Sequence, residues 1–325
     1  MINFLKTYAL FISMMVGIIF HSFITDISYI TRYFMDEPLK DITFITKYML
    51  FFMLFIVFCK VDFKQLKWEK WHIYLLLFQF SFCMIFYLLL HKFDRSMAEG
   101  ALLCILAPTA TSAPVITGLL GGGVEGLITY SISSNLLVAI FAPLYLSLIG
   151  AHGAADVDLT FVEAFLTVCE KALPLILGPF LLSLFLKFFI PSIHDFFKKK
   201  QGISFWLWTI ALVLLMARTT TDILKLDVSQ IHAAILVASI SLLTCLIQFF
   251  LGRWFGGKYH NRVASGQALG QKNTILAIWM AQTFFSPIVV IAPATYVLWQ
   301  NLVNSYQLAK HRKGLKNRCT PMRIK

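Results

Sequence analysis

Charged residues are scarce in this chain, at 14% of its 325 residues, whereas hydrophobic residues make up 58%. An ordinary soluble domain has about 25% charged residues. Mean hydropathy is +0.76, and no polar stretch is long enough to fold as a separate soluble domain. The composition excludes a soluble globular protein and predicts an all-α integral membrane protein in a lipid bilayer.

Acidic residues are especially few, with 16 Asp and Glu against 28 Lys and Arg and a net charge of +12. A nucleic-acid-binding protein would concentrate its basic residues in one domain or stripe, whereas here they gather in short loops and near the C-terminus. We therefore expect no nucleic-acid partner, and we interpret the basic loops as signals of membrane orientation.

The chain also lacks the residue clusters that fixed-site chemistry requires. Its six cysteines show neither metal-ligand pairing nor a disulfide framework and mostly fall in apolar runs, so we expect them to be small buried side chains. The histidines have no ligand spacing, and no nucleophile and base are paired. We expect no enzyme activity, no metal site and no cofactor.

Long apolar runs, in contrast, are abundant. Windows of about 20 apolar residues cross the hydrocarbon core of a bilayer, and about ten can be placed. They cover residues 3–25, 43–60, 70–90, 96–121, 124–150, 160–189, 203–222, 230–255, 262–286 and 288–309. Basic residues follow the second, sixth, eighth and tenth windows. These exits and both termini are therefore predicted to face the cytoplasm of a bacterial-type inner membrane.

The windows divide into two halves around an acidic linker. Residues 1–150 hold the first five windows, residues 151–159 form a linker that contains Asp156 and Asp158, and residues 160–312 hold the other five. Residues 313–325 form a basic cytoplasmic tail. Since the first windows of the two halves run in opposite directions, the pattern predicts an inverted repeat, which is typical of secondary transporters.

The fourth window of each half is interrupted. Residues 107–114 contain two prolines and three hydroxyls, and residues 270–274 place Lys272 beside two amides. An ionisable group at this depth costs roughly 2.5 to 3.5 kcal/mol, and non-helical backbone persists there only when it lines a cavity or is buried in protein. Two matched interruptions therefore indicate a transporter's binding site. The first interrupted window ends at Gly121–Gly123, which predicts a tight turn into the fifth window.

Simpler interpretations of these polar residues stay open. Lys272 is alternatively a side chain that extends to the cytoplasmic interface. The hydroxyls of the first interruption alternatively satisfy carbonyls that the prolines free, and Ser131 and Asn135 of the fifth window alternatively pack helices together.

Several separated motifs resemble one known family. They are the Cys59–Phe63 exit of the second window, Gln79, the region from Pro108 to Gly123, Gly270–Ala277, Phe285–Pro287 and Trp299–Asn301. Their order resembles the bile acid:sodium symporter family. The resemblance implies about ten transmembrane helices in two inverted five-helix repeats, with helices four and nine unwound and crossing, in a carrier that acts as a monomer.

The chain departs from this family at the ion site. Sodium-coupled members have a glutamate where this chain has Ala268, and a Gln–Asn pair where it has Lys272–Asn273. Ala113–Pro114 stands in place of a Ser–Asn pair, and Leu127 in place of a serine. The missing carboxylate argues against obligatory sodium coupling, because a lysine ammonium would repel a sodium ion beside it.

We predict that the ammonium of Lys272 takes the place of a bound cation at the interruption. Because burial disfavours the charged form of lysine, the same group is a candidate for proton coupling, so the coupling ion, H⁺ or Na⁺, stays open. The residues predicted to bind substrate or ion are Gln79, Thr109, Thr111, Ser112, Thr117, Ser131, Asn135, Gln271, Lys272, Asn273 and Thr274.

These observations predict a secondary active transporter that moves a small organic anion by alternating access. The resemblance implies the anion class, and a positive Lys272 beside the N-terminal ends of half-helices is electrostatically consistent with it. One alternative is a ligand sensor that keeps the carrier fold without transport. Another is a sodium-coupled symporter with remodelled ion sites.

Overall fold

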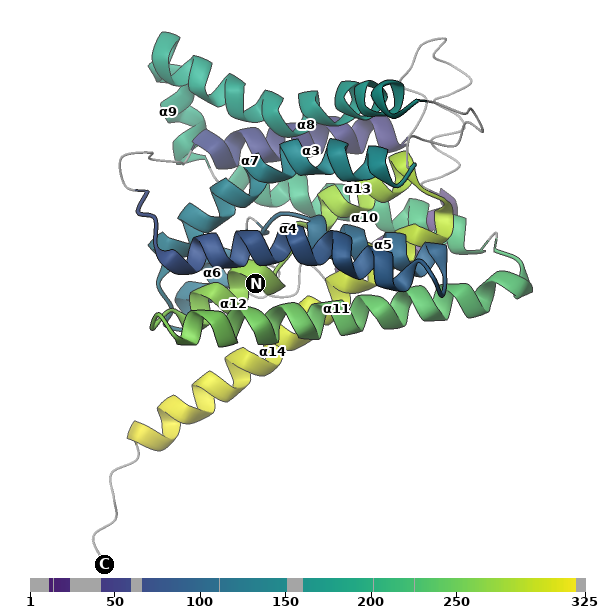
Figure 1. Ribbon diagram of the computed structural model, residues 1–325. Helices are drawn as coiled ribbons and strands as arrows, with labels where there is room; N and C mark the ends of the chain where they lie inside the picture. The colour runs from purple at the N-terminus through teal and green to yellow at the C-terminus, as the bar shows by residue number, and fades with distance from the viewer. Residues whose placement is uncertain are drawn as a thin grey trace, which may run out of the picture.

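The computed structural model of the protein describes residues 12–13, 15–23, 42–59, 66–110, 112–150, 160–200, 202–224 and 226–319. Over these residues the backbone forms helices joined by turns, with an isolated β-bridge and no sheet (Figure 1). The predicted all-α class is confirmed. Thr111, the linker 151–159, parts of the first predicted span and residues 320–325 lie outside the described residues.

The helices follow the predicted windows, and both interrupted windows are divided into two helices each. Their bounds are α3 Ile42–Cys59, α4 Lys70–Leu90, α5 Arg95–Leu106, α6 Ala113–Leu119, α7 Val124–Leu148, α8 Phe161–Phe189, α9 Pro191–Lys199, α10 Gly202–Leu224, η2 Val228–Gln230, α11 Ile231–Gly257, α12 Arg262–Gly270, α13 Thr274–Phe284, η3 Pro287–Val290 and α14 Ile291–Cys319.

Among the described residues, four helices are long and apolar enough to cross a membrane, namely α4, α7, α8 and α11. Each coincides with a predicted window. Shorter apolar helices cover Ile45–Cys59, Thr209–Thr221 and Thr274–Phe284, which also fall within predicted windows. The total of ten spans stays a prediction.

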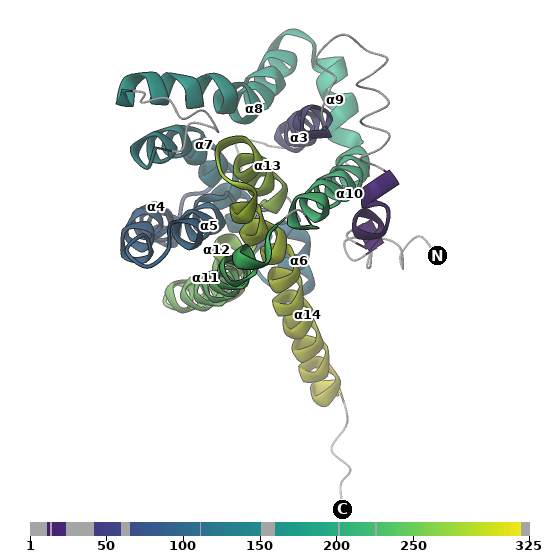
Figure 2. The same cartoon turned by 90° about the vertical axis from the view of Figure 1, so that its right-hand side faces the viewer.

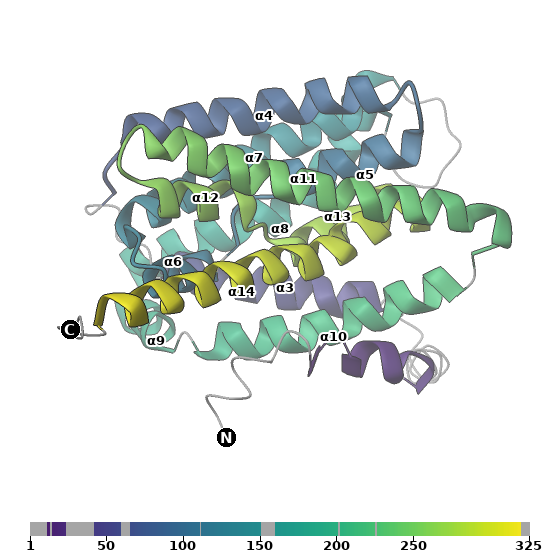
Figure 3. The same ribbon diagram turned by 90° about the horizontal axis from the view of Figure 1, so that it is seen from below.

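The helices pack as two groups with α13 between them. The helices α4, α5, α11, α12 and α14 contact one another, whereas α3 packs against α8, α9 and α10. The helix α13 contacts members of both groups and lies at the centre in Figure 2. Figure 3 shows α14 running obliquely past α12 and α13. The helix α13, the second half of the second broken window, is therefore held inside the protein.

The turn from α6 into α7 has the predicted glycine geometry. Gly121 has a φ of +71°, which side chains other than glycine rarely adopt. The Gly122 N–H donates to the Thr117 carbonyl at 2.9 Å, and α6 contacts α7. The predicted tight turn is confirmed.

The described cysteines are free. Cys59, Cys83, Cys104 and Cys245 are buried, and Cys169 is partly buried. The expectation that they serve as small buried side chains is confirmed for this part of the chain.

Two segments differ from the sequence prediction. Residues 191–199, predicted as part of a basic loop, form the helix α9, because Pro191 suits the first helical turn and Lys198 and Lys199 complement the last. The helix α14 continues to Cys319, past the predicted end of the tenth window at 309 and into the predicted tail. No proline occurs there before Pro321, and the helix continues through Gly314.

Candidate functional site

The two helix breaks meet in the interior. Thr109, in the break between α5 and α6, pairs with Lys272, in the break between α12 and α13, as an antiparallel β-bridge. The Ala110 N–H donates to the Gln271 carbonyl at 2.8 Å, and the Asn273 N–H donates to the Pro108 carbonyl at 2.8 Å. The backbone groups freed by each break are therefore partly satisfied by the other break.

Local sequence explains where the helices stop. Pro108 has no N–H with which to continue α5, and Pro114 stands in the first turn of α6. In the other half, α12 ends at Gly270, where an added Cβ would overlap the ring of Phe249 on α11. Glycine at this position thus allows the end of α12 to lie directly against α11.

The carbonyls at the C-terminal end of α5 receive donors from α4, from α11 and from the break between α12 and α13. Gln79 on α4 donates from Nε2 to the Leu106 and Ala107 carbonyls, both at 3.2 Å. Gln248 on α11 donates from Nε2 to the Cys104 carbonyl at 3.3 Å. The Ile105 carbonyl accepts from Lys272 Nζ at 2.8 Å, and the Pro108 carbonyl accepts from the Asn273 backbone N–H. An unsatisfied carbonyl at this depth would cost about 1–3 kcal/mol, so this set stabilises the break.

Lys272 is 1% exposed. Its backbone N–H donates to Oε1 of Gln300 on α14 at 2.9 Å, while its ammonium contacts the end of α5. The alternative in which this side chain extends to the interface is therefore wrong. Neither of the ion pairs formed by the described residues, Arg95–Glu99 and His194–Asp195, involves it. Its charge is balanced by the negative end of the α5 dipole and by carbonyl oxygen instead.

The C-terminal end of α12 receives neutral donors. The Tyr296 hydroxyl on α14 donates to the Gly270 carbonyl at 2.9 Å, and the Thr109 hydroxyl donates to the Ala268 carbonyl at 2.7 Å. Gln248 donates to the Tyr296 oxygen at 3.1 Å and so holds that ring in place. The Ala268 and Gly270 carbonyls at the end of α12 are thus hydrogen-bonded by uncharged hydroxyl groups.

Below the breaks, α14 presents buried amides on one face. Gln300, Asn304 and Gln307 are spaced four and three residues apart, which places them on one side of a helix. Gln267 on α12 donates from Nε2 to Asn304 Oδ1 at 2.9 Å and to Gln307 Oε1 at 3.0 Å. These bonds and the Lys272–Gln300 bond join α14 to the broken window along its length.

The structure brings most of the predicted site residues together. Six of them contact one another or the freed carbonyls through hydrogen bonds, and these are Gln79, Thr109, Ser112, Gln271, Lys272 and Asn273. Gln271 Nε2 donates to Ser112 Oγ at 2.9 Å. Thr274 begins α13 and is buried, and its N–H donates to the Lys272 carbonyl at 2.9 Å. Thr111 lies outside the described residues.

Three other predicted residues make no hydrogen bond to the breaks. Thr117 is buried toward the end of α6 beside Gly122, and its hydroxyl has no partner. On α7, Asn135 Nδ2 donates to the Ser131 carbonyl one turn earlier at 2.7 Å, whereas Asn135 Oδ1 has no partner. The Asn135 Nδ2 bond lies within one helix, so the alternative in which this pair packs helices together stays open.

The sequence prediction missed several residues that hold the breaks. Tyr130 and Ser134 on α7 donate to Gln79 Oε1 at 2.8 and 3.4 Å, and Gln248, Tyr296 and Gln300 act as described above. Gln248 carried a usable signal, since a lone amide within an apolar span requires a partner.

Two polar atoms beside Lys272 have no partner. Asn273 is the N-cap of α13, where its Oδ1 accepts from the Leu276 N–H at 3.3 Å, and this fixes its amide so that the Nδ2 donor is left over. Gln271 Oε1 is also without a partner. Buried polar atoms are almost always hydrogen-bonded, so these two are candidates for ligand contact.

A sequence model of the Sodium Bile acid symporter family matches residues 47–226, which is more than half of the chain. The matched range includes α4, the break between α5 and α6, and α7, but it ends before the break that contains Lys272. No curated protein matches the chain in sequence.

Proposed function

Because the chain belongs to the sodium bile acid symporter family, it is a multi-pass membrane transporter, and we propose that it moves a small organic anion by alternating access. The observation that carries this proposal is the buried Lys272, whose ammonium donates to a carbonyl of the other half of the chain at 2.8 Å. An ionisable residue held in this way marks an ion or substrate path.

We propose the inverted repeat on the evidence of paired contacts. In the first half, Tyr130 on α7 bonds Gln79 on α4, and in the second half Gln248 on α11 bonds Tyr296 on α14. Each pair joins the third predicted span of its half to the fifth. The two breaks that lie between these spans support two repeats of opposite orientation, with the broken helices crossing.

Figure 1 supports the proposed orientation. The C-terminal ends of α9, α11 and α14 lie on the same side of the molecule, at the left of the view. These ends carry basic residues, among them Lys199, Lys258 and Lys310. By the positive-inside rule this side faces the cytoplasm, in a bacterial-type inner membrane.

Lys272 stands where a coupling cation would stabilise the end of α5. A sodium ion needs several oxygen ligands, and here Gln79 Oε1 already accepts from Tyr130, while no carboxylate among the described residues forms an ion pair with Lys272. We propose that the ammonium replaces the ion and that transport does not require sodium. The substrate anion then contacts Lys272 and the free Nδ2 donor of Asn273.

The test is the thermal stability of the purified protein against a panel of small organic anions, with sodium or potassium, at two pH values. One anion class that raises Tm equally in both salts supports the proposal. Counterflow of that anion in proteoliposomes then distinguishes a carrier from a transport-inactive sensor, which would bind but not exchange.

Sodium-dependent stabilisation would overturn the role of Lys272 and favour a remodelled sodium symporter. Coupling to protons is tested with Lys272→Gln in the same vesicles. If Lys272 titrates during the cycle, the variant transports without the pH dependence of the natural chain. An unchanged pH dependence would exclude this group as the proton carrier.

A further inference from the structure

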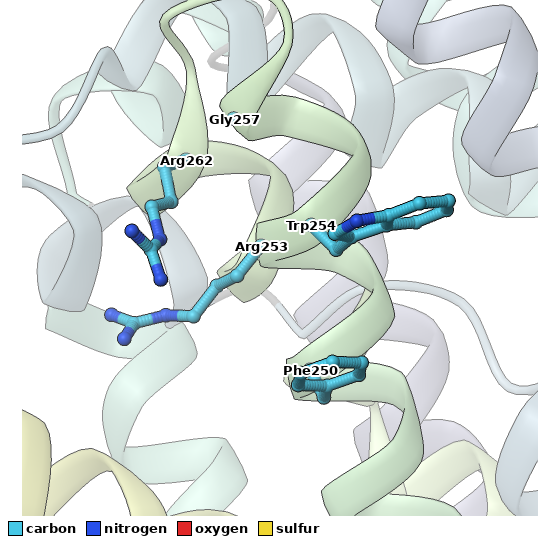
Figure 4. Close-up of a pocket in the computed structure, with 5 residues that line it drawn as sticks. All are labelled: Phe250, Arg253, Trp254, Gly257 and Arg262. Carbon is cyan, nitrogen blue, oxygen red and sulfur yellow. The ribbon is translucent and has the colours of Figure 1, made fainter.

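A second polar site lies away from the breaks, where α11 ends and α12 begins. A cavity of about 420 Å³ there is lined by Phe250, Arg253, Trp254, Gly257 and Arg262 (Figure 4). Four of these residues come from the last turns of α11, and Arg262 is the first residue of α12. None of them contributes to the breaks described above.

Two guanidinium groups meet in this cavity, and neither has an acidic partner in the part of the chain that the structure describes. In Figure 4, Arg253 and Arg262 extend to the same side, and their charges interact. Neither belongs to an ion pair among the described residues. Glu69 contacts Asn261 next to them, but its Oε2 accepts from Asn261 Nδ2 at 2.7 Å and from Trp71 Nε1 at 3.0 Å. Two adjacent like charges repel unless an anion lies between them.

Arg253 is held in place before any ligand binds. Its Nη2 donates to Gln307 Oε1 on α14 at 3.0 Å. Its stem crosses Gly266 of α12, where an added Cβ would lie 2.5 Å from Arg253 Cγ. Since a guanidinium has five N–H donors, the remaining ones are available for oxygen atoms of a ligand.

The other wall of the cavity is apolar and outward-facing. Phe250 and Trp254 are 67% and 51% exposed, on a helix apolar enough to cross a membrane. The Lys258 ammonium lies 4.4 Å from the centre of the Trp254 ring. Tryptophan beside basic residues at the end of an apolar helix is typical of the interface between hydrocarbon and water. A ligand here would place a charged group against the arginines and an apolar part along the rings.

We propose that this cavity binds the phosphate group of an anionic phospholipid at the cytoplasmic interface. Guanidinium groups bind phosphate oxygens in pairs, and basic pockets between helices on this side of the membrane suit anionic headgroups. A soluble phosphate has the same charged chemistry, but it would not use Phe250 and Trp254. The proposal is independent of which anion the protein transports.

The experiment measures apparent affinity for phosphatidylglycerol by native mass spectrometry of the full-length protein in neutral detergent, with phosphatidylcholine as the uncharged comparison. Arg262→Gln is the informative variant, because Arg262 is exposed and its side chain makes no hydrogen bond in the described structure, so folding should be unaffected. For Arg262→Gln we expect about a 5-fold loss of affinity for phosphatidylglycerol. For the double variant with Arg253→Gln and Arg262→Gln we expect about a 30-fold loss.

Lys310→Gln is the matched control, since it removes an exposed positive charge of α14 on the same side of the molecule without lining the cavity. It should change affinity less than about twofold. Equal losses in Arg262→Gln and Lys310→Gln would overturn the proposal, as would equal binding of phosphatidylcholine. Inorganic phosphate is tested separately by thermal shift. Stabilisation that it produces in the natural chain but not in Arg262→Gln would overturn the lipid assignment in favour of a soluble ligand.

Discussion

The C-terminal ends of α5 and α12 both leave carbonyls without helical partners, and the two ends receive different donors. The end of α5 is met by two glutamine amides and an ammonium, from Gln79, Gln248 and Lys272. The end of α12 is met by hydroxyls of Tyr296 and Thr109. The freed carbonyls are hydrogen-bonded by a charged group and amides at one break and only by neutral hydroxyls at the other.

This difference indicates where the chemistry of the site is concentrated. Neutral hydrogen bonds suffice to hold a broken helix, so the charge at the end of α5 is more than structural need dictates. A buried ammonium is costly to keep, which is consistent with the proposed contact between Lys272 and an anionic substrate. The variants that follow alter one end at a time.

Lys272→Met removes the charge from the end of α5 and should have the largest effect. Loss of a charged hydrogen bond is worth about 1.5–3 kcal/mol, which corresponds to about a 10- to 100-fold decrease in initial uptake rate if the bond is needed throughout the cycle. The initial rate of substrate uptake into proteoliposomes measures this decrease. Lys171→Met, in α8, is the matched control and should keep uptake within about twofold. Near-normal uptake by Lys272→Met would show that the charged and neutral ends are equivalent.

Gln79→Leu should be the most destabilising change at the end of α5. It leaves the Leu106 and Ala107 carbonyls without their donor and the Tyr130 hydroxyl without its acceptor, so we expect unfolding to become easier by about 3 kcal/mol or more. Thermal unfolding in detergent measures the loss. Gln282→Leu is the matched control, because both amide atoms of Gln282 are buried without partners. That variant should be neutral or more stable, and a loss equal to that of Gln79→Leu would contradict the hydrogen-bond explanation.

Tyr296→Phe tests the neutral end and should have a smaller effect. It removes the donor to the Gly270 carbonyl at the cost of about 1–1.5 kcal/mol in unfolding free energy. Tyr130→Phe is its counterpart in the other half. There Ser134 still reaches Gln79 Oε1 at 3.4 Å, so the loss should be lower. A larger loss of unfolding free energy in Tyr130→Phe than in Tyr296→Phe would contradict this order.

Gly121→Ala measures how much backbone strain alone reduces stability, at a turn away from the ends of α5 and α12. The residue has a φ of +71°, and an added Cβ meets only His311 at an ordinary 3.8 Å, so strain alone should reduce stability by about 1 kcal/mol. Gly257→Ala has nothing within 4 Å of the new Cβ and no positive φ, and it should not reduce stability. Thermal unfolding distinguishes the two substitutions. Equal Tm values would mean that the turn after α6 tolerates a side chain.

The sequence was sufficient to locate both breaks, because prolines and an ionisable residue within apolar windows have few structural explanations. It was not sufficient to predict their partners. Lys272 and Ile105 are 167 positions apart, and no local periodicity reports such a pairing. Tyr130 and Tyr296 resemble ordinary aromatic residues of a span until their hydroxyls are seen to reach polar atoms at the breaks.

The errors in the prediction have related causes. The helix α9 is short, and its lysines were interpreted as loop charges, although lysine is also a good helix former. The end of α14 was placed where hydrophobicity falls, but a helix can continue into water as long as no residue interrupts it. Thr117, Ser131 and Asn135 share a window with contacting residues, yet the window does not determine which side of its helix each residue occupies.

The origin of the donors at the breaks also limits how the protein can move. Apart from Lys272 and Thr109, which lie in the breaks themselves, the donating side chains come from α4, α11 and α14, and Tyr130 of α7 donates to Gln79 of α4. The helix α14 is also joined to α12 by a row of buried amides. The helices α3, α8, α9 and α10 supply none of these hydrogen bonds. Sliding within the first set would break many bonds at once, whereas sliding between the sets would break few of those described. The first set is therefore expected to move as one rigid body relative to α3, α8, α9 and α10.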